Sequence, residues 1–368
     1  MNTAGPATQP PEGTGRVRPL VAVTMGDPAG IGAEVIVKAL SDPDVRRLGR
    51  FVVYGMEESL AAAADAAGIA PYWFEHPAGE PLRVDSGVVV VDFPDFAAGY
   101  WTIARPTELG GRASLRFLEG AIAAAREEHA DAIVTAPINK VSWREAGCKH
   151  PGHTELLAEA FKAKRVTMAF VGGGLRVALA STHLSLFELR NRFTIGCVFQ
   201  PMDLLHTALR DWFGIEHPRI AVAGLNPHAG EDGRFGDEER RVIEPAMQMA
   251  KNARIDVHGP FPADTLFIPR RRSQFDGFVA MYHDQGLIPV KMLAFDTAVN
   301  VTLGLPIIRT SVDHGTAFDI AGSDQADPGS MIESLRLACH LAARTLKPVS
   351  DAVKDAPVLP AVSEAPEP

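Results

Sequence analysis

The feature that most constrains the fold is a regular alternation of strand-like and helix-like segments that begins near residue 20. Short apolar runs such as LVAVTM and RFVVYG are each followed by a segment with apolar residues at helical spacing, IGAEVIVKAL and MEESLAAAADAA. The order recurs with GVVVVDF and GRASLRFLEGAIAAAREEH before DAIVTAP. Strand, helix and strand at this spacing predict βαβ units and a largely parallel sheet with helices on both faces.

Later segments continue the pattern with one interruption. In TMAFVGGGLRVALAST three glycines separate two apolar runs, which predicts a hairpin and therefore an antiparallel pair. RIAVAGL, DGFVAMY and PIIRTSV predict further strands, and DEERRVIEPAMQMAKNA and GSMIESLRLACHLAARTLK predict further helices. These strands are more than one compact sheet usually needs, which favours two α/β lobes with a cleft between them. No internal repeat or linker is visible.

Composition excludes several classes of protein. With 368 residues, of which 46% are apolar and 22% charged, the chain can bury a large core as an ordinary globular protein. A formal charge of -9 without long basic stripes argues against a nucleic-acid partner. We expect neither a membrane span nor export, because the chain has no eighteen-residue apolar run and no signal-peptide pattern. Residues 1–18 and 348–368 are predicted to be disordered tails. The widely spaced Cys148, Cys197 and Cys339 fit a reducing cytoplasm.

A glycine cluster, MGDPAGIGAEV, follows the first predicted strand and precedes a helix. Gly26, Gly30 and Gly32 are spaced GxxxGxG, which is not the dinucleotide fingerprint GxGxxG, and the cluster lacks a Walker lysine. Two interpretations stay open, a tight strand-to-helix turn and a loop that faces a ligand. A nucleotide, if one binds, does not use the usual signature.

Three histidines share one sequence context. His183 in ALASTHLS, His228 in AVAGLNPHAGE and His283 in FVAMYHDQG each follow a predicted strand. The carboxyl ends of strands in an α/β sheet line one crevice, so the three imidazoles can converge on one ion. Three neutral imidazoles suit zinc or another divalent transition metal and leave positions open for a substrate. The alternative is coincidence among structural histidines, and no HExxH motif is present to decide.

Groups that can bind an anion lie near these histidines in the sequence: His153, Thr154, Lys291, Asn300 and Arg309. Thr154 has an alternative role in starting the helix ELLAEAF. Lys291 lies in the otherwise apolar stretch LIPVKMLAF, where a charge needs a partner. The run of three arginines at 270–272 is more typical of a solvated loop.

At this point the motifs resemble a known family. MGDPAGIGAE, PGHTELLAE, STHLSL, GLNPHAGEDGRFGDEE, GPFPADT, AMYHDQGLIPVK and GLPIIRTSVDHGTAFDIAG are together similar to the 4-hydroxythreonine-4-phosphate dehydrogenases of pyridoxal phosphate biosynthesis. The resemblance extends from about Val21 to Ala342, and residues 51–100 and 187–212 carry it least.

The resemblance implies a fold and an assembly. The expected fold class is α/β, with two α/β/α lobes and a cleft between them, like the isocitrate and isopropylmalate dehydrogenases. Residues 19–130 with 301–347 would form the cofactor lobe, and 131–300 the metal and dimer lobe. A homodimer is implied, with an active site that combines groups from both subunits.

The resemblance also implies site residues. Metal ligands fall on His183, His228 and His283; substrate contacts on His153, Thr154, Lys291, Asn300 and Arg309; cofactor contacts on Gly315, Asp319 and Gly322; and catalytic roles on Asp264 and Lys291. The implied cofactors are NAD or NADP and one divalent ion per subunit, zinc, magnesium or cobalt. HGTAFDIAG resembles the adenine-side loop of the isopropylmalate dehydrogenases, which explains how NAD can bind without GxGxxG.

The implied reaction oxidises a small phosphorylated hydroxy acid. The ion would lower the pKa of the substrate hydroxyl while hydride leaves the same carbon for nicotinamide. The product, 2-amino-3-oxo-4-(phosphonooxy)butanoate, would lose carbon dioxide to give 3-amino-2-oxopropyl phosphate. Asp264, Asp284 and Lys291 are candidate proton acceptors, and the carboxylates can instead orient histidines.

Three other functions remain open from the sequence. A paralogous dehydrogenase acting on threonate or erythronate 4-phosphate, or on a cis-dihydrodiol carboxylate, would share the same site residues, because substrate choice depends on pocket shape. A metal-dependent hydrolase also uses three histidines, although it has no need of the HGTAFDIAG segment. A non-catalytic binding protein is the weakest alternative, since an open metal site and converging cations exceed what binding requires.

Overall fold

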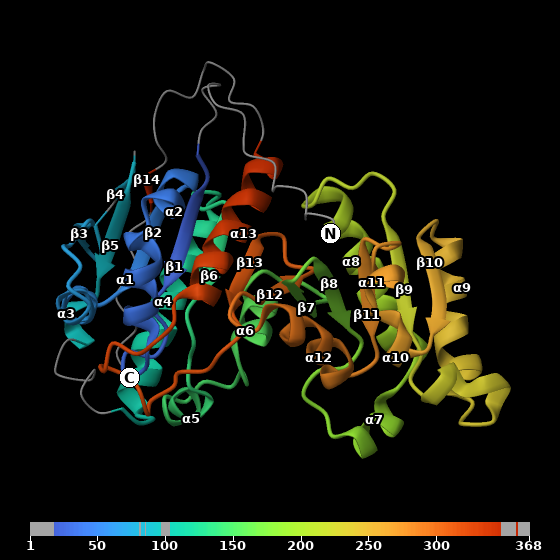
Figure 1. The fold of residues 1–368 in the computed structure, drawn as a ribbon. Helices are drawn as coiled ribbons and strands as arrows, with labels where there is room; N and C mark the ends of the chain where they lie inside the picture. Colours follow the sequence, from blue (N-terminus) through green and yellow to red (C-terminus); the bar gives the residue numbers. More distant parts are fainter. Residues whose placement is uncertain (1–17, 81, 85, 97–103, 347–357, 360–368) are drawn as a thin grey trace.

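The fold is built on a twelve-stranded sheet with helices on both faces (Figure 1). The computed structural model describes residues 18–80, 82–84, 86–96, 104–346 and 358–359. The strands of the sheet lie in the order β10-β9-β11-β8-β7-β12-β13-β6-β1-β2-β5-β3. Their bounds are β1 (Leu20–Thr24), β2 (Arg50–Gly55), β3 (Phe74–Pro77), β5 (Val88–Asp92), β6 (Ala132–Thr135), β7 (Thr167–Gly172), β8 (Leu175–Leu179), β9 (Arg219–Ala223), β10 (Asp256–Phe261), β11 (Gly277–Ala280), β12 (Val299–Leu303) and β13 (Ile308–Val312).

Helices connect most of these strands, as the sequence pattern predicts. The α-helices are α1 (Gly32–Ser41), α2 (Pro43–Leu48), α3 (Glu57–Ala66), α4 (Glu108–Arg126), α5 (Lys140–Glu145), α6 (His153–Ala160), α7 (Leu186–Arg192), α8 (Ile195–Asp211), α9 (Glu244–Asn252), α10 (Ala263–Leu266), α11 (Pro269–Arg272), α12 (His283–Ala294) and α13 (Gly329–Thr345). Shorter helical turns are η1 (Pro94–Phe96), η3 (Pro227–Gly233) and the π-helical η4 (Glu239–Ile243).

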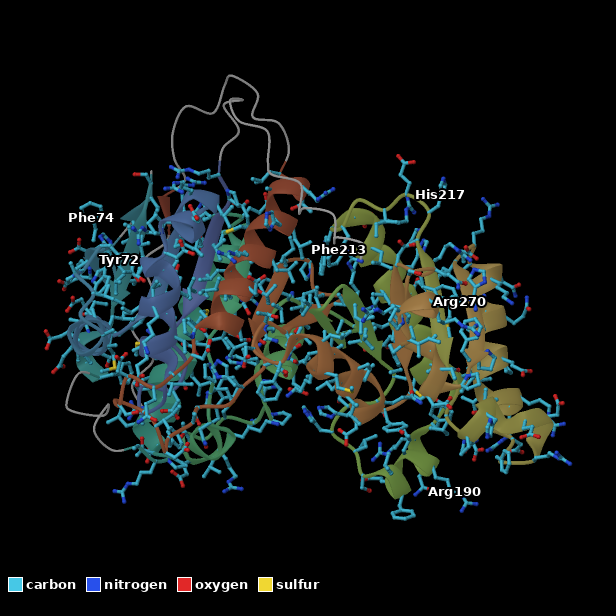
Figure 2. The ribbon with its side chains drawn as sticks, in the orientation of Figure 1. Tyr72, Phe74, Arg190, Phe213, His217 and Arg270 are labelled. Carbon is cyan, nitrogen blue, oxygen red and sulfur yellow. The ribbon has the colours of Figure 1, made fainter. Side chains whose placement is uncertain are left out.

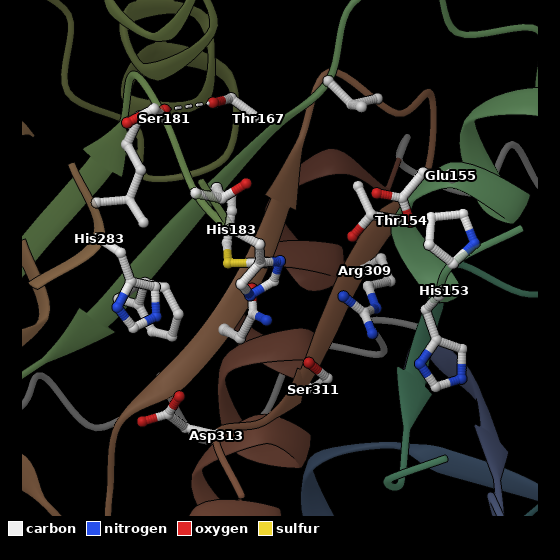
Figure 3. Close-up of a pocket in the computed structure, with 18 of the residues that line it drawn as sticks. His153, Thr154, Glu155, Thr167, Ser181, His183, His283, Arg309, Ser311 and Asp313 are labelled. Carbon is white, nitrogen blue, oxygen red and sulfur yellow. Dashed lines mark hydrogen bonds between the residues drawn. The ribbon is translucent and has the colours of Figure 1, made fainter. Parts of the chain in front are cut away.

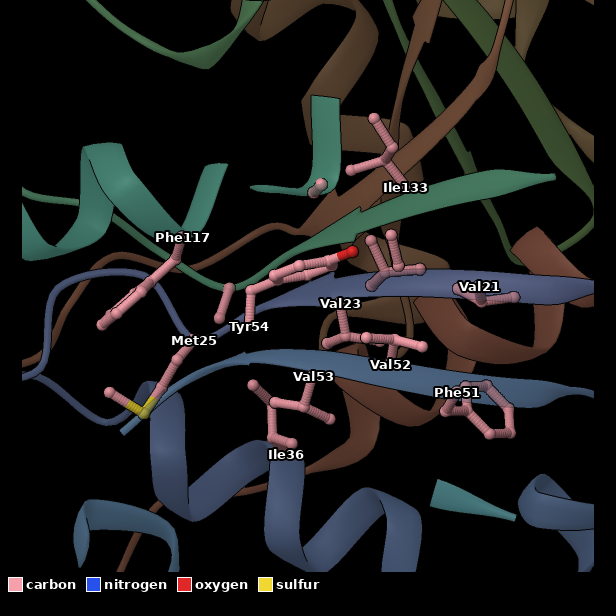
Figure 4. Close-up of a cluster of buried hydrophobic side chains, with 14 of the residues drawn as sticks. Val21, Val23, Met25, Ile36, Phe51, Val52, Val53, Tyr54, Phe117 and Ile133 are labelled. Carbon is pink, nitrogen blue, oxygen red and sulfur yellow. The ribbon is translucent and has the colours of Figure 1, made fainter. Parts of the chain in front are cut away.

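The first strands are buried on both faces, which explains why their sequences are continuously apolar. Every residue of β1 and β2 is buried, and the two strands pair in parallel. Ile36 of α1 and Phe117 of α4 lie on opposite sides of them (Figure 4). Covering both faces with helices removes these strands from water, as the alternation predicts.

Two antiparallel pairings interrupt the parallel order in the middle of the sheet. The hairpin predicted around the three glycines is confirmed, since β7 and β8 pair antiparallel with Ala169 opposite Ala178. β12 also pairs antiparallel, with β7 on one side and β13 on the other. One continuous sheet therefore runs through both halves of the molecule, although the number of predicted strands had favoured more than one sheet.

The apolar core nevertheless forms separate packing groups. One contains buried residues from 20–157 and 305–342, and two smaller groups contain buried residues from 169–303. Trp212 and Phe213 pack against the first group and against one of the two smaller groups, and Phe213 lies near the middle of the molecule in Figure 2. Along the chain, the change from the first group to the second falls between Leu157 and Ala169.

The glycine cluster forms a tight turn. A Cβ on Gly26, which has φ +74°, would lie 2.2 Å from the carbonyl oxygen of Pro137. On Gly30 it would lie 2.8 Å from the carbonyl oxygen of Thr316, and on Gly32 2.0 Å from that of Met25. Protein backbone occupies all three positions, so these glycines serve close packing, and the ligand-facing interpretation is not supported.

Most of the predicted tails, namely 1–17, 348–357 and 360–368, lie outside the described residues. Within the second tail, Val358 and Leu359 are described and form β14 (Val358–Leu359), which pairs antiparallel with β4 (Leu82–Arg83). This short pairing differs from the expected disorder. None of the described helices is both long and apolar enough to cross a membrane.

Candidate active site

A cavity of about 1050 Å³ lies where the two halves of the sheet meet (Figure 3). Seven of the predicted site residues line it: His153, Thr154, His183, His283, Asn300, Arg309 and Gly315. Five do not: His228, Asp264, Lys291, Asp319 and Gly322. The walls come from segments distant in the sequence, which is typical of a site in the crevice of an α/β sheet.

The three histidines of similar context do follow three neighbouring parallel strands. β8, β11 and β9 are adjacent and parallel, and His183, His283 and His228 come a few residues after their respective ends. The strand-end placement predicted from the sequence is therefore confirmed. Their side chains, however, do not all meet.

His183 and His283 form a pair on one wall of the cavity. Their ring centroids lie 5.9 Å apart with the rings inclined by 40°. Nδ1 of His283 lies 2.7 Å from Oδ1 of Asp284, which leaves Nε2 free to bind an ion. Burial, with the charges of Lys140 and His283, lowers the pKa of His183 and keeps it neutral, the form that a metal requires. This pair fits a divalent ion.

His228 lies apart from that pair, on the loop η3. Five successive residues from His228 to Asp232 have positive φ, between +40° and +81°, a conformation that non-glycine residues rarely adopt. The His228 side chain is exposed and its ring packs 5.8 Å from the ring of Phe235. Among the described residues no three His, Cys, Asp or Glu side chains form a group that could hold a metal. The chain by itself thus supplies two of the three expected ligands together.

Arg309 dominates the opposite wall. It is 3% exposed, and its guanidinium donates to Oγ1 of Thr302 at 3.0 Å and to Oγ1 of Thr135 at 2.7 Å. Burial lowers its pKa to about 10, with Glu155 acting in the other direction, so the group stays charged at neutral pH. Its Nε has no partner. A buried cation with a free donor indicates an anionic ligand.

Three further described residues that line the cavity each have a buried polar atom without a partner. The atoms are Nε2 of His153, Oδ1 of Asn300 and Nε2 of His314. The His153 ring packs edge-on against Trp143 at 5.3 Å. A helix-capping role for Thr154 is not supported, since the N-cap of α6 is Gly152 and no side chain caps it. Together with Nε of Arg309 these atoms form an unfilled set of donors and acceptors that a polar ligand can satisfy.

The protonation of His153 predicts a pH dependence of stability. Burial and the charge of Arg309 lower its pKa well below the ordinary 6.5. Below pH 6.5 the unfolded chain takes up a proton here and the folded chain does not, so the free energy of unfolding falls as the pH is lowered. We expect the drop between pH 7.5 and 5.5 to be about 1 kcal/mol smaller in His153→Asn than in wild type. Urea unfolding at both pH values measures it.

The matched control is His217→Asn, which changes an exposed histidine on the surface (Figure 2). Its pH dependence is expected to equal that of the wild type. An equal drop in wild type and His153→Asn would contradict the prediction.

Lys291 has the partner that its apolar surroundings require. Its Nζ lies 3.0 Å from Oδ2 of Asp313 and over the ring of Phe295 at 5.8 Å. Lys291 lines a smaller hollow of about 510 Å³ that shares His283 with the main cavity, and Asp313 lines the main cavity itself. Sequence reasoning missed Asp313, although an acid four residues after Arg309 at the end of a predicted strand was a signal for it.

The remaining predicted residues lie outside the cavity. Asp319 and Gly322 are exposed on the segment between β13 and α13, and Gly315 joins that segment to the cavity wall. Asp264 is exposed on α10, which contacts the loop η3 that carries His228. Within this chain, therefore, the elements that carry Asp264 and His228 are neighbours, and neither residue lines the cavity of His183 and His283.

Known proteins resemble this chain over most of its length. The family described as pyridoxal phosphate biosynthetic protein PdxA matches residues 47–338. The chain belongs to this family. A 4-hydroxythreonine-4-phosphate dehydrogenase of Desulforapulum autotrophicum is 44% identical, over 87% of this chain and 95% of that protein. As a family member with relatives of this identity, the chain is a dehydrogenase, and its α/β fold agrees with the sequence prediction.

Two further comparisons define the relationships of the chain within this family. The crystal structure of 4-hydroxythreonine-4-phosphate dehydrogenase from Klebsiella pneumoniae has a TM-score of 0.79 and 38% identity, covering 90% of this chain and 100% of that one. A D-threonate 4-phosphate dehydrogenase of Cupriavidus necator is 44% identical, over 89% of this chain and 98% of that protein. Relatives with two substrate names thus reach the same identity.

Proposed function

We propose that this dehydrogenase oxidises 4-hydroxythreonine 4-phosphate with NAD or NADP. The product, 2-amino-3-oxo-4-(phosphonooxy)butanoate, then loses carbon dioxide to give 3-amino-2-oxopropyl phosphate. The observation that carries the proposal is the unfilled set of polar atoms on Arg309, His153 and Asn300, which faces the His183 and His283 pair across one cavity. The anionic end of one substrate molecule can bind these polar atoms while its reacting hydroxyl lies beside the histidine pair.

In this proposal the substrate is held by its charged ends. Arg309 binds the anion through its free Nε, His153 and Thr154 add hydrogen bonds, and Asn300 accepts one from a substrate donor. Glu155 and Asp313 also line the cavity and suit the cationic amino group of the substrate. Fixing both ends sets the reacting carbon beside the imidazole pair.

A divalent ion, zinc, magnesium or cobalt, would be held by His183, His283 and His228. When bound, it supplies the Lewis acidity that makes the substrate hydroxyl more acidic and stabilises negative charge during decarboxylation. Asp284 orients the His283 ring through its Nδ1.

The protons of the reaction would be handled by Lys291 and Asp264. Asp313 lies 3.0 Å from Nζ of Lys291 and orients the lysine side chain. Lys291 is the candidate donor of a proton to the carbon from which carbon dioxide has left. Asp264, which lies near His228, is the candidate acceptor of the hydroxyl proton once that region joins the site.

The assembly we propose is a homodimer in which His228 and Asp264 reach the site of the partner subunit. Both α7 and α12 contribute residues to the cavity wall, and exposed apolar side chains lie on them and directly after α12: Leu186 at 61%, Phe187 at 95%, Ile288 at 58%, Met292 at 82% and Phe295 at 72%. A surface of this kind beside a site indicates an interface. Such a dimer would act in the cytoplasm, where its free cysteines stay reduced.

The cofactor is proposed to bind along the segment that carries Gly315, Asp319 and Gly322. Gly315 lines the cavity, and Gly322 has φ +77° with open space where a Cβ would be. This segment runs from the cavity at Gly315 to the exposed Asp319 and Gly322, so a dinucleotide bound along it could reach the substrate.

The alternative substrates are threonate or erythronate 4-phosphate and a cis-dihydrodiol carboxylate. The relative named for D-threonate 4-phosphate makes the first of these the main competitor. Glu155 and Asp313 on the cavity wall favour an amino acid over a sugar acid, because they complement an ammonium group that the sugar acid lacks.

The test is to mix the metal-loaded protein with NAD or NADP and follow reduced nicotinamide by absorbance. We expect reduction with 4-hydroxythreonine 4-phosphate and a kcat/KM at least about tenfold lower with threonate 4-phosphate. Higher kcat/KM with threonate 4-phosphate would move the chain to the paralogous group. If neither of these substrates nor a dihydrodiol carboxylate causes nicotinamide reduction, a metal-dependent hydrolase becomes the better interpretation.

A further inference from the structure

The segment between β13 and α13 is attached along its length to one helix, α1. The backbone N–H of Ile31, just before the helix, donates to the carbonyl oxygen of Thr316 at 3.0 Å. Oε1 of Glu34 accepts from the backbone N–H of Gly322 at 2.6 Å. Nζ of Lys38 donates to the carbonyl oxygens of Asp324 and Ala326, at 2.9 and 3.0 Å. Figure 1 shows this orange-red segment passing beside α1.

The attachments follow from helical spacing. Residues 31, 34 and 38 are separated by three and four positions, so they lie on one face of α1. Lys38 additionally pairs with Oδ1 of Asp324 at 2.7 Å. The opposite side of α1 is fixed in the core, where Ile36 and Leu40 are 1% and 0% exposed. The helix is therefore fixed in the core and holds the segment at three successive points along its length.

The segment needs such support because it has little order of its own. Between His314 and Pro328 it forms turns but no helix or strand, and Ala317, Gly322 and Asp324 have positive φ. Glu34 is 5% exposed and its Oε2 has no partner. Burying a carboxylate in this way is costly, and the contact that offsets the cost is the one with Gly322.

We propose that Glu34 and Lys38 are positioning residues that hold this segment in the conformation that binds the nicotinamide cofactor. The inference rests on the proposed function, in which Gly315, Asp319 and Gly322 contact that cofactor. Holding the segment before binding removes an ordering cost from association. Loosening it should weaken cofactor affinity and leave the substrate walls unchanged, since neither residue lines the cavity.

Kinetics of the metal-loaded full chain test the proposal. For Glu34→Ala and Lys38→Met we expect KM for the dinucleotide to rise about tenfold, with kcat at saturating dinucleotide and KM for the hydroxy acid within about twofold of wild type. Glu34→Gln keeps an oxygen acceptor for Gly322 and should stay close to wild type. Lys251→Met on α9 changes an exposed lysine far from the segment and is the matched control.

Hydrogen exchange supplies a second readout that does not depend on the cofactor. Amides of residues 315–326 should exchange faster in Lys38→Met than in wild type, while those of β1 stay protected. Unchanged KM for the dinucleotide in both variants, or a fall in kcat as large as the rise in KM, would overturn the positioning role. If the wild-type chain binds neither NAD nor NADP, both the proposed function and the role of the segment in cofactor binding are wrong. If the amides of residues 315–326 exchange at the same rate in Lys38→Met and in wild type, only the proposal that α1 holds the segment is wrong.

Discussion

Replacing Arg309 by methionine is expected to lower kcat/KM about a thousandfold without destabilising the protein. The guanidinium is buried, and its Nε, which has no partner, is the donor that we assign to the substrate anion. A thousandfold loss corresponds to about 4 kcal/mol, which is within the range for removing one partner of a buried, hydrogen-bonded charge pair. Stability should rise by about 1 kcal/mol, because Arg309 bonds hydroxyl groups and its cost of burial is not offset by a direct ion pair.

The comparison variant is Arg309→Lys. It keeps the charge but not the planar set of donors that reaches Thr302, Thr135 and the ligand at once, so most of the activity should still be lost. Steady-state kinetics and urea unfolding of the two variants measure both effects. Retained activity in Arg309→Met, or a large drop in its stability, would show that Arg309 has a structural role instead.

Much of the fold is predictable because burial leaves a periodic pattern in the sequence. β1 and β2 are buried along their whole length, so they read as continuous apolar runs, and α4 carries the spacing of an amphipathic helix. Other elements leave weaker patterns. β12 contains Asn300 and lies between antiparallel neighbours, and α8 has Pro201 within it, so neither was predicted.

The site was predictable to the extent that it depends on strand ends. His183 and His283 could be placed because each follows a buried strand, and Arg309 because it interrupts one. Glu34 and Lys38 act through contacts with residues 288 and 286 positions away in the sequence, which no local pattern reveals. His228 lies on the loop η3, and no local sequence pattern predicts the run of left-handed residues that shapes this loop.

Mixing two inactive variants is expected to restore activity if the site is shared between subunits. His228→Ala and His283→Ala should each lose at least about a thousandfold in kcat/KM, because each removes a proposed metal ligand. If His228 serves the partner's site, a mixed dimer contains one site with both substitutions and one with neither. Random exchange makes half of the dimers mixed, so the mixture should reach about a quarter of wild-type activity.

The control for this experiment is a mixture of His183→Ala with His283→Ala. These two rings lie together in one chain, 5.9 Å apart, so every site of the mixed dimer would lack one of them and the mixture should stay inactive. Metal content, measured after gel filtration, should change in the same way as activity: it should recover in the first mixture and not in the second. If neither mixture recovers, His228 must join His183 and His283 within one chain, and the loop η3 would have to leave its left-handed conformation to do so. The complementation result therefore separates a site completed by a second copy from one completed by a rearranged loop.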